Sequence, residues 1–326
     1  MVTKALTTII TIIVGVGAAL IVYWILNKLA ELLPERLEDR IKPYLYILPA
    51  FLGIVVYLVY PAVLTVINSF RGPISQNWVG FANFTTLFKS HDFQQTLINT
   101  LLWIIIVPAV TIVIGLTVAT LSDRLRPGAE KLTKTIIFLP MAISLIGAAT
   151  IWRFVYDAEP AGQNQIGLLN AVGQLFNKGP VDWLSTDNFH LNSLLLMVIL
   201  LWSQVGFSMV LLSAAVKGVP VDTLEAARID GANERQIFFR VIVPQIRGTI
   251  VTVFITVTIT VMKIFDVVYV NTNGGFNTNV LGNQFYNEIS TNLNYGAASA
   301  IVVILMIAVA PLMWYQVRHF KSEEAA

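Results

Sequence analysis

Cysteine is absent from this chain, histidine is rare and charged residues are few. Without cysteine, the protein can form neither a disulfide nor a cysteine-ligated metal site. The three histidines, His91, His190 and His319, lie far apart, so the sequence contains no histidine-spaced zinc helix. Charged residues make up 12% of the 326 residues, and the formal net charge of +2 is too small to indicate a nucleic-acid partner.

Catalytic signatures are missing as well. The sequence contains no G-x-x-x-x-G-K-[ST] loop to cradle phosphates, no G-x-S-x-G elbow and no aspartate-rich cluster. We therefore expect that the chain is not an enzyme by itself, that it does not hydrolyse ATP, and that it holds no cofactor or metal.

The sequence is instead rich in long apolar runs. Hydrophobic residues make up 56% of the chain and the mean hydropathy is +0.72, which leaves too little polar surface for a soluble globule. A spanning helix needs roughly 20 mostly apolar residues. Because the runs are continuous rather than alternating, they predict an all-α polytopic membrane protein with about seven transmembrane helices. The predicted spans are about 6–27, 44–67, 97–121, 133–155, 192–216, 249–270 and 295–317.

The first run could be a signal peptide or a retained helix. We favour a retained extra helix because the apolar stretch is long, its leading region has one lysine, and no small-x-small cleavage site precedes the charged run from Glu31 to Lys42.

Lysine and arginine indicate the orientation, because cytoplasmic loops are enriched in them. Fifteen of the 21 basic residues fall in four segments that would share one side of the membrane: 28–43, 123–134, 217–248 and 318–326. We therefore expect these segments and the C-terminus to be cytoplasmic, and the N-terminus to be external. On the external side, the short apolar piece from Ile166 to Phe176 predicts an amphipathic helix.

A charged island, DTLEAARIDGANERQIFFRVIVPQIR at residues 222–247, lies between two of the apolar runs. Its pattern predicts two short helices. Asp222 would cap the first helix, and Gly231 would end it in the left-handed conformation. The second helix would begin near Ala232 and stop before Pro244, with an apolar stripe of Ile237, Phe238 and Val241.

Polar and aromatic residues within the spans are candidates for a solute path. Lys263 and Asp266 are three residues apart on one predicted helix, so they could border an aqueous path or simply neutralise each other. Amide groups and aromatic faces bind sugars, but the same residues also serve in helix packing and at membrane interfaces. The other candidates are Asn99, Trp202, Gln204, Phe207 and Tyr269.

The charged island resembles the E-A-A-x-x-x-G-x9-I-x-L-P loop of binding-protein-dependent ABC importer permeases. Glu225, Ala226, Ala227, Gly231 and Pro244 match that pattern, while valines stand for the isoleucine and leucine. The stretches VGFANFTTLF, FQQTLINTLLW, FLPMAIS and KIFDVVYVNTNGG resemble the carbohydrate branch of the family. YDAEPAGQNQIGLLNAV, GANERQIFFRVIVPQI and the additional N-terminal span are most similar to permeases for α-glucosides and glucosylglycerol.

The resemblance implies a transmembrane permease subunit with two regions. Residues 1–43 would be an extra transmembrane helix with a basic cytoplasmic linker, and residues 44–326 would be the type I importer permease domain with six core helices. Within it, the loop 217–248 would couple the spans to an ATPase subunit through Glu225, Ala226, Ala227, Asp230, Gly231, Ala232 and Pro244. The sequence VNTNGGFNTNVLGNQF departs from the family's GGGP-type turn.

The resemblance also implies a setting and a set of partners. The chain would lie in a bacterial or archaeal inner membrane, surrounded by lipid, and assemble with a second permease, two ATP-binding subunits that carry ATP and Mg, and an external solute-binding protein. The cargo would be a sugar such as an α-glucoside, an oligosaccharide or a glucosylglycerol-like solute. The alternative is an ion-coupled secondary transporter, in which Asp266 would have to be the coupling acid.

Overall fold

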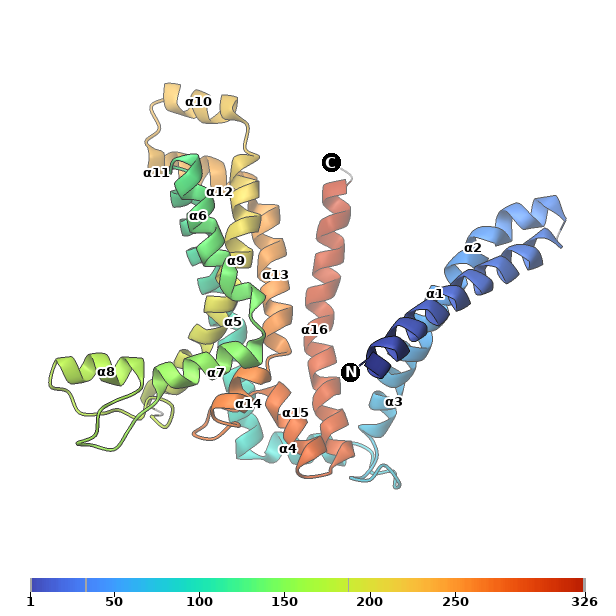
Figure 1. The fold of residues 1–326 in the computed structure, drawn as a ribbon, viewed down its shortest axis with the longest axis horizontal. Coiled ribbons are helices and arrows are strands. Elements are labelled where there is room, and N and C mark those ends of the chain that lie inside the picture. Colours follow the sequence, from blue (N-terminus) through green and yellow to red (C-terminus); the bar gives the residue numbers. More distant parts are fainter. Residues whose placement is uncertain (1, 33, 187, 325–326) are drawn as a thin grey trace. The chain divides into compact units, whose positions relative to one another are not determined.

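The computed structural model describes residues 2–32, 34–186 and 188–324, and its regular elements are helices. These residues form two compact units, residues 1–67 and residues 68–326 (Figure 1). Among the described residues, five helices are long and apolar enough to cross a membrane, or seven if each of two bent pairs crosses as one span. The predicted all-α polytopic fold is therefore confirmed.

The N-terminal unit is built from two long helical segments that fold back on each other. The first is α1 (Val2–Glu31), and the second runs from α2 (Glu35–Ile54) through the π-helical turn η1 (Val55–Val59) into α3 (Tyr60–Asn68). Tyr46 stacks on Tyr23 at a ring distance of 6.0 Å, and its hydroxyl donates to Asn27 at 2.8 Å.

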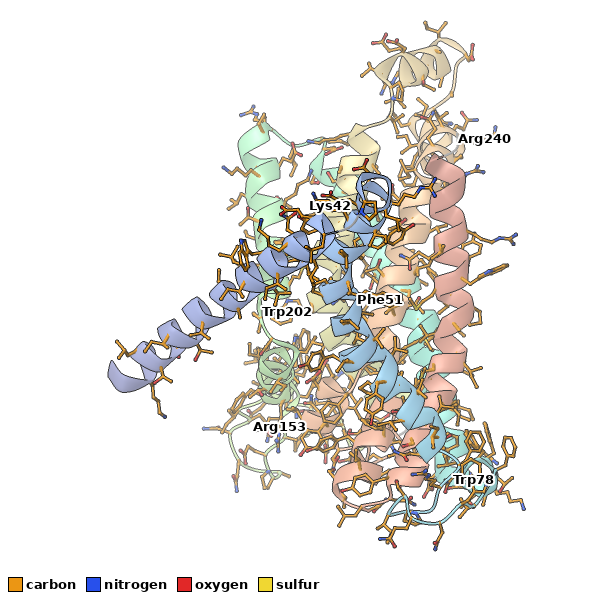
Figure 2. All side chains as sticks on the ribbon, turned by 90° about the vertical axis from the view of Figure 1, so that its right-hand side faces the viewer. Lys42, Phe51, Trp78, Arg153, Trp202 and Arg240 are labelled. Carbon is orange, nitrogen blue, oxygen red and sulfur yellow. The ribbon has the colours of Figure 1, made fainter. Side chains whose placement is uncertain are left out.

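Much of the segment predicted as a basic linker, 28–43, is helical in this unit. Its charges pair along the helices, Lys28 with Glu31 at 2.7 Å and Lys42 with Glu38 at 2.8 Å. Apolar side chains such as Phe51 on α2 remain exposed (Figure 2), as expected for helices that are solvated by lipid.

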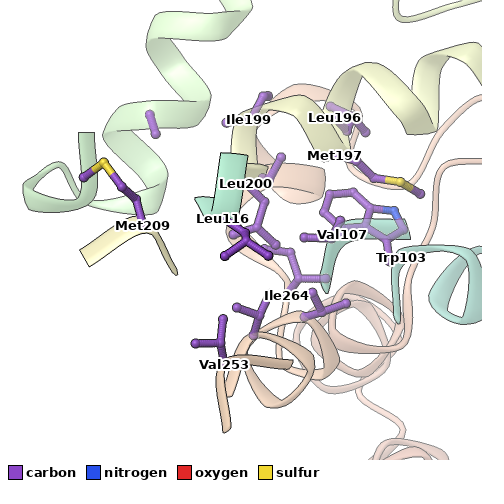
Figure 3. Packing of buried hydrophobic residues seen from close by; sticks show 14 of the residues in the cluster. Trp103, Val107, Leu116, Leu196, Met197, Ile199, Leu200, Met209, Val253 and Ile264 are labelled. Atoms are coloured by element: carbon purple, nitrogen blue, oxygen red, sulfur yellow. The ribbon is translucent and has the colours of Figure 1, made fainter. Parts of the chain in front are cut away.

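The second unit is centred on α5 (His91–Ser122), α9 (Leu191–Lys217) and α13 (Arg247–Met262). Trp103 and Val107 of α5 are buried with Leu196 and Leu200 of α9, and Val253 of α13 joins the same cluster (Figure 3). Helices without a side chain at the contact point can approach closely. A Cβ atom at position 115 on α5 would lie only 2.4 Å from the hydroxyl of Ser208 on α9.

The predicted span over 133–155 is a sharply bent pair of helices and not one continuous helix. The chain forms α6 (Pro127–Phe138), a short 3-10 turn η2 (Leu139–Ala142) and then α7 (Leu145–Tyr156), and the two arms meet at 103°. Pro140 lies in the turn, and Ser144 caps α7 by accepting a hydrogen bond from the Gly147 amide at 3.2 Å. The apolar composition continues across this break, so hydropathy alone could not detect it.

The predicted span over 249–270 is also interrupted. Helix α13 ends at Met262, and a separate short helix, α14 (Asp266–Asn271), begins after a break. Gly282 packs against this break, because a Cβ there would lie 2.4 Å from the Ile264 carbonyl oxygen. Gly282 belongs to α15 (Leu281–Ser290), which leads into the last helix, α16 (Tyr295–Glu324).

Two shorter helices belong to the same unit. Helix α4 (Ala82–Lys89) precedes α5, and α8 (Leu168–Leu175) confirms the short helix predicted between Ile166 and Phe176. Asn170 holds α8 to its loop: its amide donates to the carbonyls of Asp157 at 2.8 Å and Val181 at 3.0 Å.

Candidate coupling loop and solute path

The charged island follows α9 and projects beyond it as α10 (Val221–Ile229), far from α14 and α15 (Figure 1). The chain then turns and returns through α11 (Glu234–Ile237), the π-helical stretch η4 (Phe238–Ile242) and α12 (Val243–Gln245). These elements meet α13 at an angle of 69°. The island is therefore a structured helical hairpin, as predicted.

Gly231 ends α10 in the left-handed conformation, with a φ of +81°. The Gly231 amide donates to the Arg228 carbonyl at 3.0 Å, and the Ala232 amide donates to the Ala227 carbonyl at 3.0 Å. This pair of hydrogen bonds is the Schellman motif, which satisfies the last carbonyls of a helix and reverses the chain. The predicted role of Gly231 in the turn is confirmed.

The helix boundaries in the island differ from those predicted. Asp222 is not the cap of α10: Pro220 occupies that position and Asp222 lies in the first turn. The second helix begins at Glu234, because Asn233 and Gln236 form a capping box there. The helix also continues past Pro244. Proline has no N–H to donate, and the π-helical stretch before Pro244 shifts the backbone hydrogen-bond register, so the helix tolerates the missing donor.

Helix α10 presents one face to the protein and leaves the other free. Leu224 packs against the main core, and Thr223 and Ala227 are half-buried beside it. On the opposite face, Val221 is exposed and Ile229 is 86% exposed. Glu225 and Ala226 also lie on this exposed face. A small apolar patch with an adjacent carboxylate is typical of a surface that binds a partner.

A cluster of charges joins three helices where α9 enters the island. Lys134 of α6 lies 2.6 Å from Glu130 and 3.3 Å from Asp123, which follows α5. Lys134 also donates to the hydroxyl of Ser213 on α9, and Lys217 pairs with the same two carboxylates. We call these five residues the charge clamp. The sequence predicted none of it, although the spacing of Glu130 and Lys134 allows an ion pair along one helix.

The predicted solute-path residues do not form one site. Asn99 is buried on α5, where its amide donates to the backbone carbonyls of Asn277 and Asn279. Trp202 lines an apolar cavity of about 450 Å³ beside Trp152, at a ring distance of 5.9 Å. Gln204 and Phe207 are half-buried on α9 and line neither this cavity nor the polar one described below.

Lys263 and Asp266 do not share a helix, which corrects the prediction. Lys263 is the exposed cap of α13, and Asp266 begins α14 after the break. No ion pair between them occurs in the described part of the chain. Instead, the break brings Tyr269, Phe265 and Tyr286 into contact, with ring distances of 4.7 to 5.0 Å. Tyr269 is 40% exposed. This aromatic triad includes two residues that sequence reasoning missed.

A polar cavity of about 380 Å³ lies where the start of α5 meets α15 and the loop before it. All but one of its lining residues carry an amide, hydroxyl or carboxylate side chain, and the exception is Gly274. The polar residues are Ser90, Asp92, Gln95, Thr96, Asn99, Asn277, Asn279, Gln284, Glu288 and Asn292. Among the described residues, no group of three or more histidine, cysteine, aspartate or glutamate side chains could hold a metal ion. Hydrogen bonding is therefore the chemistry that this cavity offers.

Comparison with known proteins identifies relatives over nearly the whole chain. Residues 104–320 match the family described as binding-protein-dependent transport system inner membrane component. The alpha-glucoside transport system permease protein AglF of Rhizobium meliloti is 41% identical over 334 residues, covering 98% of each chain. The osmoprotective compounds uptake permease protein GgtC of Synechocystis is 44% identical over 280 residues, covering 86% of this chain and 99% of that one.

A solved structure has the same fold. It is a bacterial alginate ABC transporter in complex with an alginate pentasaccharide-bound periplasmic protein. One of its chains matches with a TM-score of 0.74 and 20% sequence identity, over 86% of this chain and 96% of that one.

Proposed function

The chain belongs to the family of binding-protein-dependent transport system inner membrane components, and on this premise we propose that it forms half of the translocation path of an ATP-driven importer of α-glucosides or related solutes. Membership makes the chain a multi-pass inner membrane permease of a sugar ABC importer, non-catalytic itself, with ATP bound by a partner ATPase. The family membership that the E-A-A loop predicted is thereby confirmed.

The exposed face of α10 would dock into a groove on the ATPase subunit. The supporting observation is that small Ala226 lies on the same face as exposed Val221 and Ile229. The short side chain of Ala226 permits close approach of a partner, and burial of the two larger apolar side chains against that partner would be favourable. Glu225 stands on the same face and would pair with a basic group of that subunit. Asp230, Gly231 and Ala232 would hold the turn that aims this face.

Movement of the ATPase would then reach the spans through two short connections. Helix α10 joins α9 through the residues around Gly218, and it joins α13 through α11 and α12, in which Pro244 lies. The charge clamp ties the end of α9 to α5 and α6, so a displacement of α10 would move these helices together rather than bend α9 alone. ATP binding and hydrolysis would shift the population between outward-open and inward-open states.

The aromatic triad is the strongest support for the solute path. Sugar rings stack on aromatic faces, and Tyr269 offers a partly exposed ring on the same short helix as Asp266, whose carboxylate can accept hydroxyl hydrogen bonds. Asn99, Trp202, Gln204 and Phe207 make weaker candidates, because the contacts of Asn99 and Trp202 with other residues already account for their positions.

The cargo and the partners are inferred from the relatives. The printed names of AglF and GgtC specify α-glucosides and osmoprotective compounds. The complex would contain a second permease, two ATP-binding subunits and a solute-binding protein docked on the external face. The lysine and arginine distribution supports a cytoplasmic coupling loop and C-terminus and an external N-terminus.

The experiment that tests this function is uptake by the assembled complex in proteoliposomes. The chain is reconstituted with a second permease, an ATPase and a binding protein from the same organism, and entry of a radiolabelled α-glucoside is followed with and without internal ATP. We expect uptake to require ATP and every partner. Uptake by the single chain, or uptake that persists when ATP is replaced by an ion gradient, would instead support the ion-coupled alternative.

A further inference from the structure

The polar cavity lies on the other side of α15 from the aromatic triad. Gln284 and Glu288 are four residues apart and line the cavity, whereas Tyr286 lies between them in sequence and joins the triad. In a helix, residues four apart share a face, and a residue two positions away points to the opposite side. The cavity is therefore a separate site from the proposed solute path.

One wall of the cavity is a chain of oriented amide groups. The Asn283 amide donates to the Asn279 side-chain oxygen at 2.8 Å, Asn279 donates to Gln284, and Gln284 donates to the Glu288 carboxylate at 3.0 Å. Gly274 permits this packing, because a Cβ there would lie 2.7 Å from the Asn279 oxygen. The wall is thus fixed before any ligand arrives, which lowers the entropy cost of binding.

The cavity also holds an acceptor that lacks a donor. Asn99 lines the cavity two helical turns beyond Asp92 and is completely buried. Its amide nitrogen donates to two carbonyls, but its side-chain oxygen has no hydrogen-bond partner in the described structure. An unsatisfied buried acceptor destabilises the folded protein. Because protein atoms cover this oxygen, a ligand in the cavity would reach it only after a side chain of the lining shifts.

The lining selects the chemical class of the ligand. Asp92 and Glu288 are carboxylates and no lysine or arginine lines the cavity, so an anion would be repelled. A divalent cation is disfavoured because the side-chain oxygens of Asn279 and Gln284 already accept hydrogen bonds from neighbouring side-chain amides. Gln95, Asn292 and Ser90 add groups that both donate and accept. This mixture fits a neutral solute that carries many hydroxyl groups.

The size of the site fits two sugar rings. The cavity of about 380 Å³ is within the roughly 300–1,000 Å³ range of small-molecule sites. A second cavity of about 320 Å³ shares Ser90, Gln284 and Glu288 with it, so the two adjoin and form an extended groove, although apolar side chains such as Leu87 and Phe93 also line the second cavity. We propose that this groove is an accessory binding site for a neutral disaccharide or glycosyl polyol, distinct from the solute path at the aromatic triad.

The choice of a sugar rests on the proposed function, so the test measures binding without transport. The full chain is placed in lipid nanodiscs, and saturation-transfer difference NMR follows its binding of maltose, a two-ring α-glucoside. A Tyr269→Ala background removes a contribution from the aromatic triad. We expect maltose to bind in this background and both Asp92→Asn and Glu288→Gln to weaken its affinity about tenfold, because each removes a charged acceptor.

The matched control is Glu159→Gln, which changes a half-buried carboxylate outside the groove and should leave the affinity unchanged. Absence of maltose binding, equal affinity in all three carboxylate variants, or displacement of maltose by micromolar Ca²⁺ would overturn the inference. ATP-dependent uptake by the assembled complex would stand in each of those cases. Conversely, if maltose still binds but uptake does not depend on ATP, the proposed transport function would be wrong and the inferred binding site would be retained.

Discussion

Replacing Gly231 by proline should abolish transport while the protein remains inserted in the membrane. Gly231 has a φ of +81°, whereas proline is fixed near −65°, so the backbone would have to rotate by roughly 145°. The substitution also removes the amide that donates to the Arg228 carbonyl at 3.0 Å, and it disfavours the conformation of Asp230 before it, where ψ is 1°. The Schellman turn cannot survive these changes, and the exposed face of α10 would no longer be aimed at its partner.

Replacing Gly231 by alanine isolates the backbone contribution. A Cβ at this position would meet nothing within 4 Å, so no steric clash adds to the cost. The left-handed conformation alone costs a non-glycine residue about 1–2 kcal/mol, which corresponds to a roughly 5- to 30-fold shift in a two-state equilibrium. Asparagine enters this conformation more easily than alanine. We therefore expect transport to decrease in the order glycine, asparagine, alanine, proline.

The assay is ATP-driven uptake in proteoliposomes that contain the assembled complex, with ATPase activity measured in parallel. Gly162→Ala is the matched control, since Gly162 has a φ of +92° and a Cβ there would also meet nothing within 4 Å, but it lies outside the coupling loop. The control should carry the same local strain and retain uptake. Normal uptake by Gly231→Pro, or equal losses in Gly231→Ala and Gly162→Ala, would refute the coupling role of this turn.

The sequence predicted features that depend on local patterns. Long apolar runs predicted the helical membrane fold, and Gly231 predicted the turn because few other residues adopt a positive φ readily. The same local reasoning failed where the composition does not change across a break. Residues on both sides of Pro140 are apolar, so nothing in their hydropathy indicated that α6 and α7 meet at 103°. The break after Met262 lies at Lys263 and Asp266, whose charges had been interpreted as a pair on one continuous helix.

The groove and the charge clamp could not have been found from local patterns. The groove combines Asp92 and Asn99 with Gln284 and Glu288, which lie almost 200 positions further along the chain. Asn99 shows the difficulty well. It was predicted to face a solute because it is a polar residue in a span, yet its amide nitrogen serves the backbone of the 273–280 loop. Only the tertiary structure shows that its oxygen is left without a partner.

Two further predictions concern stability, measured by thermal unfolding of the purified chain in detergent. Lys134→Met should destabilise the protein by about 1–3 kcal/mol, because it leaves Asp123 and Glu130 together with only Lys217 between them, and each of the three clamp residues concerned is about one-fifth exposed. Lys28→Met changes an exposed ion pair that solvent screens, so it should lower the unfolding temperature less than Lys134→Met does, and equal effects would contradict the clamp. Gly206→Ala should cost about 1–3 kcal/mol, because the new Cβ would lie 2.6 Å from the Ile137 carbonyl oxygen, where α9 packs on α6. At Gly128, where a Cβ meets nothing within 4 Å, alanine should be neutral or stabilising by up to about 1 kcal/mol. A stabilised Gly206→Ala variant would show that α6 and α9 do not depend on this close approach.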